Sequence, residues 1–157
     1  MKPPADIVVY SPDDQIQLVV EVKSEKGATD IWAAEMRRNL ITHAAVPRSK
    51  FFLLALPDHF YLRRDSVSTD VVPADYKVWA REALRLYLEN MTPKEVSGES
   101  FELLVRSWLS DLINSDDQRN VVYPFASKVE CLCHGAEHNV KFALVPANSR
   151  KRTVKVI

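Results

Sequence analysis

Three charged residues near the start of the chain have the types and the spacing for metal-assisted chemistry. Asp6 leads into an apolar run, and Glu21 and Lys23 end the next apolar run. Charges on strands that enter a core are costly unless they are paired or hold a metal. Carboxylates and the carbonyl of Val22 are oxygen ligands of the kind Mg²⁺ or Mn²⁺ prefers, and a lysine can stabilise charge developing on phosphate. These residues predict metal-assisted hydrolysis of phosphodiesters.

The two apolar runs predict a β-hairpin that brings the three charges onto one face. With a two-residue turn at Asp13-Asp14, Asp6 lies directly opposite Glu21, and opposed residues share a face. Lys23 follows Glu21 by two positions and therefore shares that face as well. A slip of one residue would turn Asp6 away, so the prediction depends on the parity of the register.

At these positions the chain resembles the restriction-endonuclease-like, or PD-(D/E)XK, nuclease superfamily. The motif of that family is an acid on one strand of a hairpin, Glu-x-Lys on the next strand, and then a helix. Here the matching residues are Asp6, Glu21 and Lys23, with a helical stretch from about Asp30, and the resemblance covers residues 4–64. It implies that Asp6 and Glu21 bind the metal and that Lys23 is catalytic. The family's first helix and strand have no counterpart here, because the acid follows only five residues.

Residues 31–45 predict the helix that follows the hairpin. Thr29 or Asp30 can cap it. In the resembling family a polar residue of this helix often reaches the active site, which makes Glu35 the next catalytic candidate and Arg38 the one after it. The alternative is that both are exposed charges on a surface helix. The apolar stripe of this helix consists of Trp32, Met36, Leu40 and Ala44.

The next segments predict the rest of an α/β fold with a mixed sheet. Residues 50–56 form a continuous apolar run, typical of a strand buried on both faces, and the strand–helix–strand order predicts parallel pairing with the hairpin. Residues 59–63 predict a short returning strand. His59 would mark the start of that strand or act as a proton shuttle. A Ser/Thr/Asp/Pro-rich loop follows over residues 65–75.

Two amphipathic helices are predicted to pack on the sheet. The first spans about residues 76–90, with Asp75 as its cap and Trp79 among its packed residues. The second begins at Ser97 or Ser100. Its apolar residues recur at helical spacing and predict a core stripe of Phe101, Leu104, Val105, Trp108, Leu109 and Leu112.

Charge divides the chain into two parts, although the whole chain has a net charge of zero. Residues 119–157 carry seven Lys or Arg and two Glu, a net charge of +5, so residues 1–118 carry −5. We expect residues 1–118 to form the nuclease-like domain and residues 119–157 to form a basic C-terminal extension. Such a tail fits contact with nucleic acid, DNA in the first place, or is a solvated charged segment.

The remaining composition excludes some classes of protein and leaves one metal motif open. Only three glycines occur, which excludes a Gly-rich phosphate loop. No apolar run is long enough to span a membrane and the N-terminus lacks a signal peptide, so we expect a cytoplasmic protein. A cluster near the C-terminus could bind zinc or contain free thiols, and its residues are Cys131, Cys133, His134 and His138.

A non-catalytic function competes with the nuclease. A nuclease-like scaffold without its first helix could act as a module for binding or assembly of nucleic acid or protein. A second copy of the chain could complete the sheet at an exposed edge. The chain could also be a fragment of a longer protein that supplies the missing elements.

Overall fold

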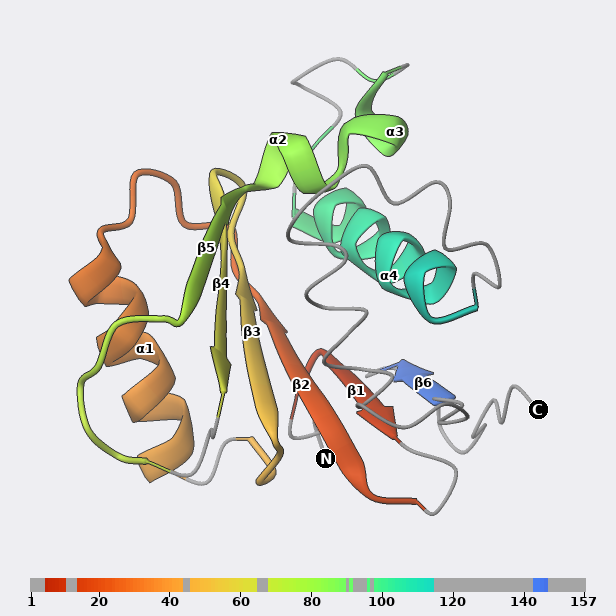
Figure 1. The fold of residues 1–157 in the computed structure, drawn as a ribbon. Helices are drawn as coiled ribbons and strands as arrows, with labels where there is room; N and C mark the ends of the chain where they lie inside the picture. Colours follow the sequence, from red (N-terminus) through yellow and green to blue (C-terminus); the bar gives the residue numbers. More distant parts are fainter. Residues whose placement is uncertain are drawn as a thin grey trace.

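The protein is built around one mixed β-sheet with helices on both faces (Figure 1). The computed structural model describes residues 5–10, 14–43, 46–64, 68–89, 91, 96, 98–114 and 143–146. The sheet has the strand order β5-β4-β3-β2-β1-β6, in which β2 and β3 are parallel and the other neighbours are antiparallel. The strands are β1 (Ile7–Tyr10), β2 (Ile16–Val22), β3 (Phe51–Ala55), β4 (His59–Arg64), β5 (Tyr76–Trp79) and β6 (Ala143–Pro146). The helices are α1 (Asp30–Thr42), α2 (Ala80–Ala83), α3 (Arg85–Leu88) and α4 (Gly98–Asn114).

The hairpin of β1 and β2 has the predicted parity. Ile7 pairs with Val20, and the same register continues through the next two pairs of the ladder. Extended by one position, it places Asp6 opposite Glu21. The β-branched residues that dominate both strands favour this extended pairing. The prediction that both acids share one face of the sheet is therefore confirmed.

Toward its tip, the ladder of the hairpin departs from the predicted register. The register shifts before Tyr10, which pairs with Ile16 and leaves Gln17 as the extra residue of a bulge. Asp14 has a φ of 59°, in the left-handed region that a short polar residue tolerates. An uninterrupted register down to a tight turn is therefore wrong, because the bulge absorbs one residue on β2.

Each face of the sheet buries its own apolar cluster. On the face that α1 covers, Val8, Val19, Leu54 and Tyr61 pack with Ala33 of the helix. We call this the α1 face. The opposite face, the α4 face, is packed with α2 and α4 (Figure 1). Its cluster includes Ile7, Val20, Leu53, Phe60, Phe101 and Trp108.

The strand β3 confirms the predictions made for the apolar run at residues 50–56. All of its residues except Phe51 are buried, as expected of a strand covered on both faces. It runs parallel to β2, with Val22 opposite Ala55, and α1 forms the crossover between them. The predicted returning strand is β4, which begins at His59 and pairs with β3.

The helix α1 confirms the prediction of a helix after the hairpin but packs through a different stripe. Thr29 is the cap, with its Oγ1 accepting a hydrogen bond of 3.1 Å from the N–H of Trp32. Its fully buried residues are Ala33, Ala34 and Arg37, whereas Trp32 and Met36 of the predicted stripe are only partly buried. The contact face is thus rotated by about one residue from the predicted stripe.

The helix predicted for residues 76–90 is wrong at its start. Tyr76–Trp79 form the edge strand β5, in which Trp79 pairs with His59. Asp75 does not cap a helix, since its carboxylate accepts hydrogen bonds from the N–H of Arg64 at 2.6 Å and from Arg63 at 3.1 Å. Two short helices, α2 and α3, follow. Pairing with β4 overrides the helical periodicity of this segment.

The helix α4 confirms the second predicted amphipathic helix. Phe101, Val105, Trp108 and Leu109 are buried, so the stripe is a core contact. The rings of Phe60 and Trp108 lie 5.2 Å apart, which anchors α4 on the sheet. No helix in the described ranges is long and apolar enough to cross a membrane.

Candidate functional site

Asp6, Glu21 and Lys23 come together on the α1 face, at the end of the sheet where β2 and β3 end and β4 begins. We call this the site end of the sheet. The Nζ of Lys23 lies 2.6 Å from Oε2 of Glu21 and 4.0 Å from Oδ2 of Asp6. The ammonium group therefore contacts both carboxylates. The predicted convergence of the three charges is present.

The electrostatics of this group are those of two crowded carboxylates with one counter-ion. Burial raises the pKa of Glu21 above its usual value, the hydrogen bond from Lys23 opposes that shift, and the charge of Asp6 adds to it. The side chain of Glu21 is only 6% exposed and that of Asp6 is 13% exposed, whereas Lys23 is 31% exposed. A desolvated acid pair beside a solvent-accessible lysine is an arrangement that enzymes use for chemistry.

Backbone contacts hold the acids and the lysine in place. Oδ2 of Asp6 accepts a 2.8 Å hydrogen bond from the N–H of Val22, which ties the start of β1 to the end of β2. The N–H of Lys23 donates to the carbonyl of Ala55 at 3.1 Å, so β2 stays paired with β3 up to the catalytic candidate. Both functional strands are thus fixed at the point where their charged side chains emerge.

A contact from α4 reaches the same corner from the other face of the sheet. Nη2 of Arg106 lies 3.4 Å from the carbonyl of Asp6 and 2.6 Å from Oε1 of Glu102, one helical turn away. This arginine links α4 to the backbone of a metal-ligand candidate. Its position does not follow from sequence, because a lysine or arginine on an amphipathic helix usually faces water.

The donor set fits a magnesium ion. Mg²⁺ is typically bound through one or two protein carboxylates, with waters and substrate phosphate completing an octahedron. Asp6 and Glu21 supply two carboxylates whose mutual repulsion a divalent cation would offset. Within the described ranges, no group of three or more His, Cys, Asp or Glu side chains is placed to hold a metal ion, so this corner offers two carboxylates and leaves the other positions of the octahedron to water and phosphate.

Glu35 and Arg38 do not join this group in the part of the chain that the structure describes. Glu35 is exposed on α1, and Nη2 of Arg38 donates to Oδ1 of the neighbouring Asn39 at 3.2 Å. The helix starts at the site end and runs away from it. At about 1.5 Å per residue, Glu35 and Arg38 lie about 7 and 12 Å further along its axis than Asp30.

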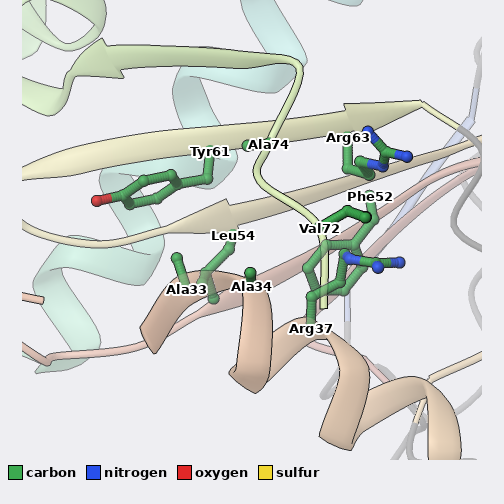
Figure 2. Close-up of a pocket in the computed structure, with 9 residues that line it drawn as sticks. All are labelled: Ala33, Ala34, Arg37, Phe52, Leu54, Tyr61, Arg63, Val72 and Ala74. Atoms are coloured by element: carbon green, nitrogen blue, oxygen red, sulfur yellow. The ribbon is translucent and has the colours of Figure 1, made fainter. Parts of the chain in front are cut away.

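Arg37, the buried arginine of α1, binds backbone carbonyls of the loop before β5. Its guanidinium donates to the carbonyls of Ser68 at 2.9 Å and Asp70 at 2.8 Å, and Arg63 holds Asp75 of the same connection. Figure 2 shows both arginines beside the segment that carries Val72. The small cavity between them has a volume of about 10 Å³, room for about one water molecule.

A second polar cluster lies on the same face, over β4 and β5. Lys77 donates to Oδ1 of Asp30 at 2.6 Å, and the hydroxyl of Tyr61 donates to the same oxygen at 3.4 Å. The hydrogen bond from Lys77 lowers the pKa of Asp30 and raises that of Lys77. The first turn of α1 is thereby fastened to the sheet.

Asp58, in the turn between β3 and β4, ties this cluster to the site end. Its carboxylate accepts a 2.6 Å hydrogen bond from the N–H of Gly27, and its carbonyl accepts a 3.0 Å hydrogen bond from the N–H of Ala80. Gly27 has a φ of +67°, a conformation that other residues adopt with strain. The loop that follows Lys23 and the end of β5 therefore share one anchor. In the sequence, Pro57-Asp58 indicates only a turn and gives no sign of this anchoring role.

The predicted zinc motif stays a prediction, because the cluster of Cys131, Cys133, His134 and His138 lies outside the described residues. Within the proposed C-terminal extension, Ala143–Pro146 form β6, which pairs antiparallel with the outer edge of β1. That edge is therefore covered without a second copy of the chain.

Comparison with known proteins does not assign the chain to a family. No protein family model, no curated protein and no solved structure matches it.

Proposed function

We propose that the protein is a Mg²⁺-dependent nuclease that hydrolyses phosphodiester bonds of nucleic acid, with DNA as the first substrate to test. The observation that carries this proposal is the convergence of Asp6, Glu21 and Lys23 at one corner of the sheet, with Nζ of Lys23 in contact with both acids. Two strands, paired in a register of defined parity, are needed to produce that arrangement.

The order of the elements supports the same proposal. A hairpin with the acids, a crossover helix and a buried parallel strand follow one another as β1, β2, α1 and β3. This is the order that the restriction-endonuclease-like resemblance implies for the part of the fold around the motif. A restriction-endonuclease-like core is accordingly part of the proposal.

Each residue has a role in the proposed reaction. Asp6 and Glu21 would hold Mg²⁺, which when bound would polarise the scissile phosphate and lower the pKa of a bound water. The hydrogen bond from Val22 N–H orients the carboxylate of Asp6 in advance. Lys23 is the most exposed of the three and can turn from Glu21 toward the substrate, where its ammonium would stabilise negative charge on the phosphate.

A cleavage assay with matched variants tests the proposal. Asp6→Asn, Glu21→Gln and Lys23→Met should each lower cleavage in Mg²⁺ by about 100-fold or more, the cost of losing a preorganised electrostatic contact. Each has an exposed control of the same type outside the triad: Asp14→Asn, Glu25→Gln and Lys50→Met, which should keep the wild-type rate.

The substrates should include duplex DNA, single-stranded DNA and RNA, with Mg²⁺, Mn²⁺ or EDTA. Absence of cleavage of all three substrates in both metals would refute the nuclease. If the protein then still bound Mn²⁺ through Asp6 and Glu21, the non-catalytic module would be the remaining function.

A further inference from the structure

A second surface at the site end has the composition of a nucleobase contact. Trp79 ends β5 and is 46% exposed, although its ring is the largest apolar group of that strand. The imidazole of His59, its partner across the ladder, lies 4.1 Å from the indole between ring centroids with a tilt of 34°. The tryptophan is therefore held against a second ring while much of its surface faces solvent.

Two cationic side chains lie close to these rings and to the neighbouring ring of Tyr61. The guanidinium of the exposed Arg81 lies 5.1 Å from the ring centroid of Trp79, and Nζ of Lys77 lies 5.5 Å from that of Tyr61. Two acids lie near this group: Asp30 pairs with Lys77, and Asp58 precedes His59 and acts on its imidazole electrostatically. An exposed aromatic ring flanked by cations is complementary to a base and its phosphate.

The surface lies on the same face and at the same end of the sheet as the acid pair. Tyr61 belongs to the α1 face, and the ladder of β4 and β5 puts His59 and Trp79 on that face too. Three inter-strand steps separate β2 from β5, about 14 Å at the usual strand spacing. Lys26 is exposed in the loop that joins Lys23 to α1, and it adds a cation to this end of the sheet.

We propose that Trp79 and His59 form a stacking platform for an unpaired base of a single-stranded nucleic acid whose backbone passes the Asp6–Glu21 corner. The inference rests on the proposed nuclease function and names its substrate as single-stranded. The base takes the place of the Arg81 guanidinium on the indole, and Arg81 moves to an adjacent phosphate. Asp58 links the two surfaces, because it accepts hydrogen bonds from Gly27 in the loop after Lys23 and from Ala80 at the end of β5.

Binding in the absence of divalent metal tests the platform without cleavage. The probe is a fluorescein-labelled oligothymidylate of about eight nucleotides, measured by anisotropy in EDTA. Trp79→Ala should weaken binding by about 5- to 150-fold, the effect of losing one stacked base, and Trp79→Phe should restore most of it. The control is Leu86→Ala on α3, an apolar residue that is more exposed than Trp79, which should bind as the wild type does.

The salt dependence separates stacking from phosphate contact. Arg81→Gln should reduce the slope of log affinity against log salt by about 0.7, the loss of one counterion released from a single strand, whereas Trp79→Ala should leave the slope unchanged. An unchanged slope in Arg81→Gln would refute the phosphate contact.

The outcomes distinguish this inference from the nuclease itself. Wild-type cleavage together with full oligonucleotide binding by Trp79→Ala would overturn the platform and leave the nuclease standing. Binding that depends on Trp79 in a protein that cleaves nothing would support the platform and refute the nuclease. If Trp79→Ala instead separated a dimer into monomers, with oligonucleotide affinity unchanged, the surface would be a contact between copies and the platform would be overturned.

Discussion

Nζ of Lys23 lies 2.6 Å from Oε2 of Glu21, so a protein cation already occupies the position beside the acid pair that a metal ion would approach. The ammonium group contacts Asp6 as well, at 4.0 Å. Lysine and metal therefore compete for the same negative charge. The metal affinity of this corner depends on a lysine that is not itself a ligand.

Replacing that lysine should strengthen metal binding while it lowers the rate of cleavage. At an effective dielectric constant of about 20, two unit charges 4 Å apart interact by about 4 kcal/mol. Solvent screens most of this for a lysine that is 31% exposed, so removing the ammonium in Lys23→Met should tighten Mn²⁺ binding by about tenfold. Titration of Mn²⁺ followed by electron paramagnetic resonance measures this directly. Lys50→Met is the control, and an affinity equal to or weaker than that of the wild type would contradict the competition.

The buried acid should reduce the stability of the metal-free fold. Glu21 is almost fully buried and lies beside a second carboxylate, so Glu21→Gln removes a desolvated charge while an amide oxygen can still accept from Lys23. We expect Tm in EDTA to rise by about 1 to 3 °C, as for other functional groups held against stability. Glu25→Gln should leave Tm unchanged. A fall of several degrees in Glu21→Gln would show that the ion pair stabilises the fold.

Adjacent arginines on α1 should differ in their contribution to stability. Arg37 is 3% exposed and donates to two backbone carbonyls of the loop before β5, whereas Arg38 donates to the side chain of Asn39. Arg37→Met should lower the free energy of unfolding by about 2 to 3 kcal/mol, the effect of losing charged hydrogen bonds. Arg38→Met should change it by less than about 0.5 kcal/mol. Urea denaturation measures both, and equal effects would contradict the role assigned to Arg37.

The stacking of His59 should be visible in its titration. Burial against neighbouring groups lowers the pKa of His59 below its usual 6.5, and the charge of Lys77 lowers it further. Trp79→Ala and Lys77→Met should each raise that pKa toward 6.5, which nuclear magnetic resonance titration of the imidazole protons measures.

The same shift makes stability depend on pH. Below pH 6.5 the unfolded chain binds the proton more readily than the folded protein does, so the free energy of unfolding falls as the pH drops through this range. His59→Gln should reduce that fall. A His59 pKa at or above 6.5 in the wild type would contradict the packed ring pair.

The parity of the hairpin could be predicted from sequence because it depends only on the two-residue period of a strand. Asp6 and Glu21 are each separated from the tip by a run of apolar residues, and counting along those runs placed them opposite each other. The bulge at Gln17 could not be predicted, since it depends on how the two strands twist against their neighbours. The predicted and observed registers agree at the site end and differ only toward the tip.

Residues whose role depends on distant partners escaped prediction for a common reason. Arg37 is buried because a loop more than thirty residues away presents carbonyls to it. The helical spacing of its neighbours predicts a helix at Trp79, but this residue pairs with His59 at the edge of β4. Tertiary pairing of this kind overrides the helical spacing, and the local signal for the strand is limited to the β-favouring Tyr76, Val78 and Trp79.

The bulge between Val9 and Tyr10 divides the hairpin ladder into two parts. The pairs from Ile7 to Val9 keep the register that places Asp6 opposite Glu21, whereas Tyr10 pairs one position out of that register. A shift of one residue over the whole ladder would turn Asp6 to the other face. The three pairs next to the corner therefore set how the two acids face each other, and the pairing beyond the bulge does not.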